Sequence, residues 1–231
     1  MKWRKGAVKF NTLYLKSIHD PEPGLLKPGS NNKKLGYIVT KGRWKNKRLF
    51  SLTLEERSTC PTTCHHWDDC YGNNMPFAKR YRHGEALREA IHHDIKRLLD
   101  TFPYGVVIRL HVLGDFYSVP YVAFWGALLG KYPKLAIFGY TAHRPAVGKV
   151  QGDDIGESIS FLNGKFEDQC VIRFSFDKDY DEISGARFAS SEAHQGDTFT
   201  CPEQTGQVKS CATCAACWGK YCTKTVKFLS H

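Results

Sequence analysis

The sequence predicts an α/β fold and, within that class, a small or incomplete βα barrel. Short runs of branched apolar residues alternate along the chain with stretches that have the apolar period of a helix. Strands separated by helices are joined by right-handed crossovers, which produces a largely parallel sheet. The alternative is an open doubly wound sheet, but the sequence lacks the glycine-rich phosphate-binding turn typical of that class.

The strongest elements lie in the middle of the 231-residue chain. Residues 85–102 carry apolar side chains every three or four positions, which predicts an amphipathic helix. A second helix is expected over residues 120–132, with Pro120 in its first turn, where the missing N–H costs little. Strands are predicted at residues 48–54, 106–113, 135–140 and 170–176, and weaker strand candidates lie at residues 186–189, 198–200 and 226–229.

Charge and composition divide the chain into three segments. Residues 1–47 are expected to form a basic N-terminal arm, residues 48–200 a barrel-like catalytic domain, and residues 201–231 a cysteine-rich metal-binding extension. The first 50 residues hold 13 Lys and Arg against two acidic residues, whereas the other 181 hold 20 basic and 21 acidic residues. The net charge of +10 therefore comes from the first segment.

The basic arm indicates a nucleic-acid partner, with DNA favoured over RNA. Its cations cluster in KGRWKNKR at residues 41–48, where Lys45 and Arg48 flank Trp44 and lie near Tyr37. This pattern suits phosphate contacts combined with stacking on a base or a sugar. The alternative is a solvated basic surface, because net charge indicates non-specific attraction and not a site.

The expected compartment is the cytoplasm, without membrane insertion. The N-terminus has no apolar run of the length a signal peptide needs, and no segment approaches about 18 apolar residues. Disulfides do not persist in a reducing cytosol, so closely spaced cysteines are interpreted as metal ligands.

Two groups contain most of the nine cysteines. The first thiol group is Cys60, Cys64 and Cys70, and three thiolates leave one position open on a tetrahedral metal or on one iron of a 4Fe–4S cluster. His65 or His66 would instead close a structural zinc site, and ordinary buried cysteines are the third alternative. Cys170, alone on an apolar strand, is expected in the core.

The second thiol group is expected to close a metal site by itself. It comprises Cys201, Cys211, Cys214 and Cys217, with Cys222 or His231 as substitutes. Repeated C-x-x-C spacing directs sulfur atoms to a common centre, although spacing does not separate zinc from iron–sulfur.

Polar residues at the ends of the predicted strands are the candidate catalytic and substrate-binding groups. Arg109 and His111 alternate with apolar neighbours, which predicts that they share a face, and Gly114 lets the chain turn sharply before Asp115. Arg173 and Asp177 repeat this pattern on a later strand. The predicted catalytic residues are His111, Asp115 and Asp177, and the predicted substrate-binding residues are Lys45, Arg48, Arg109, Tyr117, Thr141, His143 and Arg173.

The segments STCPTTC, CYG, RLHVLGDFYS, FGYTA and C-x-x-C-x-x-CW resemble, in this order, the phage and prophage proteins grouped as the gene product 88 family. The resemblance covers roughly residues 35 to 231. It implies a mobile-element setting and a role related to nucleic acid.

The layout is also similar to two classes of barrel enzyme. Radical SAM enzymes place three cysteines after their first strand, and the resemblance implies a 4Fe–4S cluster that binds S-adenosylmethionine, with a second cluster in the extension. The x3 then x5 spacing of this chain departs from their x3 then x2. Guanine transglycosylases combine two aspartates with a late zinc site, which implies base exchange at Asp115 and Asp177.

The sequence therefore predicts an enzyme that carries one or two 4Fe–4S clusters, or zinc, and that modifies a nucleic-acid base or a nucleotide. Its reactive centre would be the first thiol group, and the second thiol group would be auxiliary. The alternatives are the base-exchange enzyme with structural zinc and a non-catalytic zinc protein that binds nucleic acid.

Overall fold

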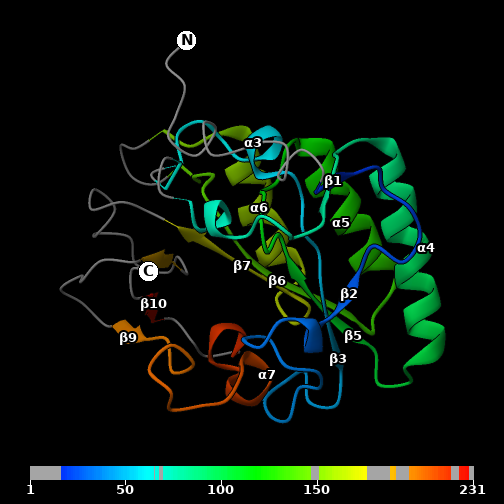
Figure 1. Ribbon diagram of the computed structural model, residues 1–231, viewed down its shortest axis with the longest axis vertical. Coiled ribbons are helices and arrows are strands. Elements are labelled where there is room, and N and C mark those ends of the chain that lie inside the picture. Colours follow the sequence, from blue (N-terminus) through cyan, green and yellow to red (C-terminus); the bar gives the residue numbers. More distant parts are fainter. Residues whose placement is uncertain are drawn as a thin grey trace.

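A computed structural model of the chain describes residues 17–64, 66–67, 70–146, 151–175, 188–190, 198–219 and 224–228. Its main sheet has eight strands among these residues, in the order β2-β3-β5-β6-β7-β8-β10-β9 (Figure 1). Strand β2 is antiparallel to β3, and every other pairing in this sheet is parallel. The strands are β2 (Lys27–Pro28), β3 (Arg48–Ser51), β5 (Val106–Leu110), β6 (Leu135–Thr141), β7 (Cys170–Ser175), β8 (Phe188–Ser190), β9 (Thr198–Thr200) and β10 (Thr225–Lys227).

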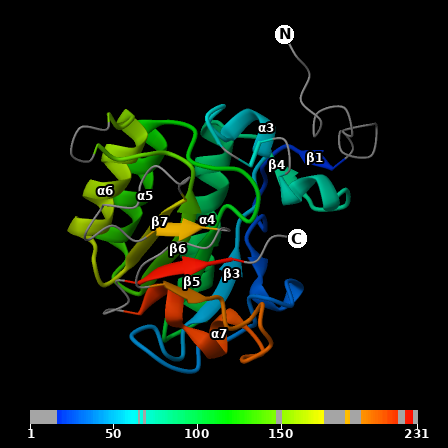
Figure 2. The same ribbon diagram turned by 90° about the vertical axis from the view of Figure 1, so that its left-hand side faces the viewer.

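Three long helices cover one face of the main sheet, which we call the α4 face (Figures 1 and 2). They are α4 (Glu85–Thr101), α5 (Val119–Lys131) and α6 (Asp154–Lys165). Along β5, the side chains of Val106, Ile108 and Leu110 join the apolar cluster beneath these helices, whereas Val107 lies on the opposite face. This alternation is the period of a strand with both faces buried.

The opposite face, which we call the α7 face, is covered by two segments that are distant in sequence. Leu35, Val39 and Trp44 pack there with Ala212 and Trp218, and the rings of Trp44 and Trp218 stack 5.7 Å apart. Residues of the predicted arm and of the predicted extension therefore meet over the sheet. Two short helices belong to this cover, α7 (Cys211–Cys214) and the 3-10 turn η4 (Ala216–Trp218).

The remaining elements are short. Strands β1 (Ile18–His19) and β4 (Arg80–Tyr81) form a separate parallel pair. The helix α3 (Glu56–Thr59) and the 3-10 turn η2 (Tyr71–Asn74) belong to the first cysteine loop, and the 3-10 turn η1 (Gly29–Asn31) follows β2. None of the described helices combines the length and apolarity that crossing a membrane requires.

The predicted α/β class and mostly parallel sheet are confirmed, but the sheet is open. Strands β3, β5, β6, β7 and β8 are neighbours in chain order, with their crossover helices on one face, which is the winding of a βα barrel. Among the described strands, however, β2 and β9 stay at opposite edges and do not pair. The physical reason is the cover on the α7 face, which occupies the side that a closed barrel would turn inward.

The sequence prediction missed helix α6. Asp153 caps this helix, its side chain accepting from the backbone N–H of Gly156, and Ile159 and Leu162 are buried against the core. Among the predicted elements, α4, α5, β5, β6 and β7 differ from prediction by at most a few residues at either end.

Candidate functional site

The first thiol group lies on the loop between β3 and β4, beyond the carboxyl end of β3. None of the eight cysteines that the structure describes forms a disulfide. Burial raises the pKa of Cys60, and the negative charges of Asp115, Cys64 and Cys70 raise it further. The structure therefore brings the three thiols and Asp115 into one electrostatic environment.

A buried ion pair holds this loop in place. The guanidinium of Arg80 donates to both carboxylate oxygens of Glu56, at 2.8 and 3.2 Å, and both side chains are at most 3% exposed. Arg80 also donates to the carbonyl oxygens of Gly72, Met75 and Ala78. A fixed guanidinium fork with this many acceptors orders the backbone around Cys70.

Arg57 adds a second tie within the same loop. Its guanidinium donates to the carbonyl oxygen of Trp67 and, at 3.0 Å, to the side-chain oxygen of Asn73. Neither Arg57 nor Arg80 was identified from the sequence, because the position of an arginine in the sequence gives no sign of the groups that its guanidinium will contact.

Gly114 packs closely against Leu54 and Thr59, which precede Cys60 in the first cysteine loop. Its φ is +86°, and a Cβ atom there would lie 2.7 Å from both the Leu54 Cβ and the Thr59 Oγ1. The expected sharp turn before Asp115 is therefore present, and only glycine fits it.

The second thiol group lies on the α7 face. Burial raises the pKa of Cys211 to about 12, and the charges of Cys217 and Cys201 add to this rise. Burial also raises the pKa of Cys217, whose neighbours include Cys201 and Cys214. Cys217 is thus within electrostatic range of Cys201, Cys211 and Cys214.

Metal binding by either thiol group stays a prediction. Among the described residues, no three His, Cys, Asp or Glu side chains are grouped closely enough to hold a metal ion as they stand. The alternative ligands His65, Cys222 and His231 lie outside the described residues. His66 is described and contributes to no such group.

Two arginines and a tyrosine lie beside the second thiol group. Arg173 is 1% exposed and donates to the carbonyl oxygens of Cys217, at 2.9 Å, and Lys224, at 3.1 Å. The Arg109 guanidinium carbon lies 4.5 Å from the centre of the Tyr140 ring. The hydroxyl of Tyr140 hydrogen-bonds to the Cys217 sulfur, and burial raises the pKa of this hydroxyl well above its ordinary value.

These arginines carry unused donors. Among the described residues, Nη1 of Arg109 and Nη2 of Arg173 have no hydrogen-bond partner, and neither guanidinium forms an ion pair with a carboxylate. Burying an arginine without a counter-charge is costly. The α7 face therefore has positive charge that the described protein groups do not balance.

The charge of Arg109 acts on groups near both cysteine segments. Enclosure of the Tyr71 hydroxyl raises its pKa, although 46% of the residue's surface is exposed, and the charge of Arg109 opposes this rise. Tyr71 is adjacent to Cys70 in the chain, and the charge of Arg109 also acts on Cys211. Arg109 is therefore within electrostatic range of Cys211 and of the residue that follows Cys70.

His111 does not share a face with Arg109, so this prediction from strand alternation is wrong. Strand β5 ends at Leu110, and His111 has a φ of +54°, which turns its ring to the α4 face. There the ring lies edge-on against Phe116, and Nε2 is 3.3 Å from the Tyr121 hydroxyl. Burial, aided by the charges of Arg109 and His143, lowers the pKa of His111 to about 3.

Asp115 is a buried connector between strand ends. It is 3% exposed; Oδ1 accepts from the backbone N–H of Phe116 at 2.8 Å, and Oδ2 accepts from that of Ala142 at 2.7 Å. Thr141 donates to the same carboxyl, whose pKa burial raises against the opposing charge of His143. With both oxygens engaged, this geometry favours a positioning role over attack on a substrate.

His143 and Thr141 belong to the same network. The ring of His143 has its Nδ1 3.0 Å from Asp153 Oδ1 and its Nε2 2.7 Å from the carbonyl oxygen of Phe116. Both ring nitrogens therefore face oxygen atoms that accept hydrogen bonds. Thr141 is 1% exposed and accepts from the His143 backbone N–H.

The remaining predicted site residues lie elsewhere. Tyr117 stacks on Tyr121 at 4.3 Å, on the α4 side of the sheet. Lys45 and Arg48 lie at the amino end of β3, away from the first cysteine loop. Asp177 is outside the described residues.

The interpretation of Trp44 as a base-stacking residue is wrong. It is 2% exposed, and its indole N–H donates to the carbonyl oxygen of Asp168 at 2.8 Å. Cys170, in contrast, is 1% exposed in the apolar cluster of the α4 face, as predicted.

Fold and site together define an α/β protein with a mostly parallel sheet and two groups of free thiols. The chain is similar to the Gene 88 protein of Mycobacterium phage L5, with 25% identity over 119 residues. The match covers 48% of this chain and 50% of the phage protein, so the chain spans about half the length of that relative. The predicted resemblance is thus confirmed as a distant similarity. No protein-family model matches the chain, and no solved structure matches it.

Proposed function

We propose that the protein is a thiolate-metal enzyme that modifies a nucleic-acid base or a nucleotide, with Arg109 binding an anionic group between the two thiol groups. One observation carries the proposal: Arg109 is partly buried beside Tyr140, and its Nη1 is buried without a hydrogen-bond partner among the described residues. A guanidinium with a free edge is suited to a carboxylate or a phosphate.

The chemistry of the donor set fits a thiophilic metal. Thiolates are the ligands that select zinc and iron–sulfur clusters, and ligation removes the thiol protons. The resulting negative charge would be balanced by the unpaired guanidinium groups of Arg109 and Arg173. The sulfur atoms must close in to become ligands, because the described groups do not hold a metal ion as they stand.

Each group of residues has a separate part in this proposal. Cys60, Cys64 and Cys70 would hold the reactive metal, and the second thiol group would hold the auxiliary one. A bound 4Fe–4S cluster supplies an electron and an open coordination position, as in enzymes that use S-adenosylmethionine. The chain's own contribution is to order the first loop through Arg80 and to fix the anionic end of a cofactor or substrate through Arg109.

The nucleic-acid part is supported by charge and by the relative. The excess of positive charge in the first 50 residues suits a polyanion, and the similar protein comes from a phage. The base-exchange alternative requires an aspartate free to attack a sugar. Asp115 has both oxygens hydrogen-bonded, so we do not extend that alternative.

Metal analysis of protein purified without oxygen tests the metal part. We expect bound iron and absorbance near about 400 nm, which is typical of iron–sulfur thiolate sites. Cys60→Ser should lower the metal content through the first group, and Cys211→Ser should lower it through the second. Cys170→Ser is the matched control, since it removes one sulfur from the other face of the sheet.

The outcomes separate the alternatives. A colourless protein that binds zinc in both groups would support the non-catalytic zinc protein. Equal metal content in wild type, Cys60→Ser and Cys211→Ser would contradict both metal assignments.

A further inference from the structure

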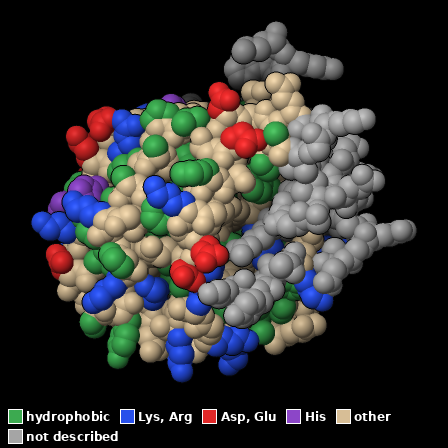
Figure 3. All heavy atoms as spheres, turned by 180° about the vertical axis from the view of Figure 1, so that it is seen from behind, with side chains coloured by type: hydrophobic (Ala, Val, Ile, Leu, Met, Phe, Trp, Pro, Cys, Tyr) green, Lys and Arg blue, Asp and Glu red, His purple; other side chains and the backbone are tan. Residues whose placement is uncertain are grey.

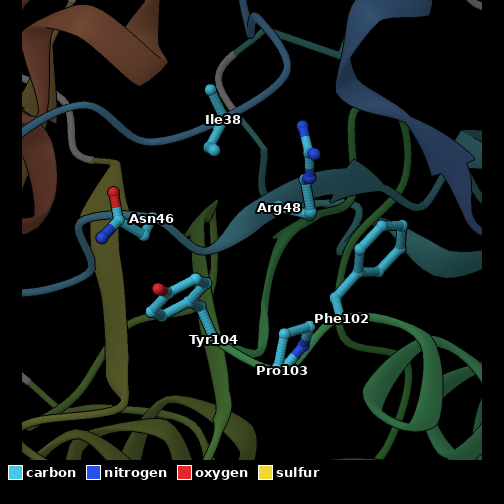
Figure 4. A pocket seen from close by; sticks show the side chains of 6 residues that line it. All are labelled: Ile38, Asn46, Arg48, Phe102, Pro103 and Tyr104. Carbon is cyan, nitrogen blue, oxygen red and sulfur yellow. The ribbon is translucent and has the colours of Figure 1, made fainter.

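A cavity of about 340 Å³ lies at the opposite end of the strands from the first thiol group. Arg48 is the first residue of β3, and the 102–104 segment joins α4 to β5, so the cavity is at the amino ends of these strands. Figure 4 shows Phe102 and Tyr104 on either side of Pro103, with Arg48 and Ile38 across the space. The lining is formed by Ile38, Asn46, Arg48, Phe102, Pro103 and Tyr104.

Aromatic rings at this cavity are exposed. Tyr104 is 67% exposed and Tyr37 is 43% exposed, which is unusual for such large side chains. The Arg48 guanidinium carbon lies 4.3 Å from the centre of the Tyr37 ring and 5.5 Å from that of Phe102. The arginine is therefore held over two rings, and Tyr104 is left with its own ring open to a ligand.

The surroundings of the cavity are positively charged. Lys45 is exposed, and among the described residues no ion pair joins Lys45, Lys47 or Arg48 to an acidic side chain. Burial and the charge of Lys134 lower the pKa of Lys47 to about 8, so these two cations repel each other. Figure 3 shows Lys and Arg side chains along the lower edge of the molecule, where the loop before β3 lies in Figure 1.

We propose that this cavity binds single-stranded nucleic acid, with one base stacked on Tyr104 and the adjacent phosphates on Arg48 and Lys45. Proteins that bind single strands combine exposed aromatic rings with cations that form no ion pair. The rings stack on the bases, and the cations contact the phosphates. A duplex does not offer an unpaired base. The inference rests on the nucleic-acid part of the proposed function and is independent of the metal.

Fluorescence anisotropy with a labelled oligothymidylate of about 12 nucleotides tests this site. Tyr104→Ala should weaken binding roughly fivefold to a hundredfold, the range of one lost base–aromatic stack. Lys45→Ala should weaken binding to any sequence and reduce its salt dependence, since one phosphate contact is lost. Phe161→Ala is the matched control, because Phe161 is 70% exposed on α6 and should leave affinity unchanged.

Equal affinity of wild type and Tyr104→Ala would overturn the site and leave the proposed function standing. Stronger binding of a poly-glutamate peptide than of the oligonucleotide would also overturn it, in favour of an acidic protein partner. A wild type that binds no oligonucleotide would overturn both the site and the nucleic-acid part of the function. The metal content of Cys60→Ser tests the metal part separately, and the oligonucleotide affinity of that variant should equal that of wild type.

Discussion

The two faces of the main sheet are built from alternate residues of the same strands, yet they differ in chemistry. On the α4 face, β5 and β7 contribute Ile108, Leu110 and Ile172 to a continuous apolar cluster. On the α7 face, the same strands contribute Arg109 and Arg173, whose unused donors lie beside cysteines. The first face follows the ordinary rule of apolar burial, and the second departs from it.

This difference in side chains gives the two faces of the sheet different energetic roles. Burying a large apolar side chain stabilises a fold by about 1.5–3 kcal/mol, whereas burying a charged group costs several kcal/mol before pairing. Apolar burial on both faces contributes stability, and on the α7 face Arg109 and Arg173 add a cost that binding would offset. Four sets of substitutions test this comparison.

The largest effect is expected for Trp125→Ala on the α4 face. Trp125 is fully buried between α5 and the sheet, so the variant should lose about 3–5 kcal/mol of unfolding free energy in urea titrations. Trp218→Ala on the α7 face is the matched change. It should expose residues 201–219 to protease before the main sheet unfolds, because Trp218 packs on Trp44 and Phe138. Simultaneous loss of both faces in Trp218→Ala would contradict the distinction.

Next is Glu56→Gln, which leaves Arg80 buried without its counter-charge. We expect a loss of about 3 kcal/mol in the free energy of unfolding, since breaking one side of a buried pair is more costly than removing both. The double variant Glu56→Gln with Arg80→Met should recover part of this loss. A single variant as stable as wild type would show that the pair does not hold the first cysteine loop.

A smaller effect per pH unit, which accumulates between pH 6.5 and pH 3, is expected from the pH dependence due to His111. Its folded-state pKa of about 3 lies below the ordinary value of 6.5, so the unfolded chain takes up the proton first as pH falls. Stability from this group is therefore complete above pH 6.5 and declines toward pH 3, by about 1.4 kcal/mol per pH unit. The difference in unfolding free energy between wild type and His111→Gln should shrink as pH falls, and a constant difference would contradict the assignment.

The smallest effect on stability is expected for Arg173→Met. Replacing a buried guanidinium that lacks an ion pair among the described residues should change the unfolding free energy of metal-free protein by less than about 1 kcal/mol. The same variant should bind less metal in the second thiol group. The positive charge of Arg173, which would balance the negative charge of the thiolates, is then missing. A large loss of stability with unchanged metal content would show that Arg173 stabilises the fold and does not support metal binding.

Much of the fold was predictable because its signals are local. The apolar run of β5 and the helical period of α4 stand out in the sequence, and the structure places both within a few residues of prediction. Helix α6 was missed although Asp153 is a good N-cap and Ile155, Ile159 and Leu162 recur at helical spacing. Its glycines and serines weakened that pattern, and packing against α5 and β7 supplies the rest.

The candidate site was less predictable. Strand alternation placed Arg109 correctly among polar groups but misplaced His111, because its positive φ comes from the turn that follows β5. Buried arginines such as Arg80 look like any other basic residue in the sequence. Asp115 was expected to be reactive, and only the structure shows that both of its oxygens are engaged.

By itself, the sequence determined the α/β class, the mostly parallel strands and the grouping of the cysteines, because hydrophobic period and residue spacing are local properties. Tertiary structure alone decided that residues near Trp44 and Trp218 cover the α7 face, that the sheet stays open among the described strands, and that the charge of Arg109 acts on both Tyr71 and Cys211. These outcomes depend on contacts between segments far apart in the chain, and no local pattern specifies which distant surface will bury a given face.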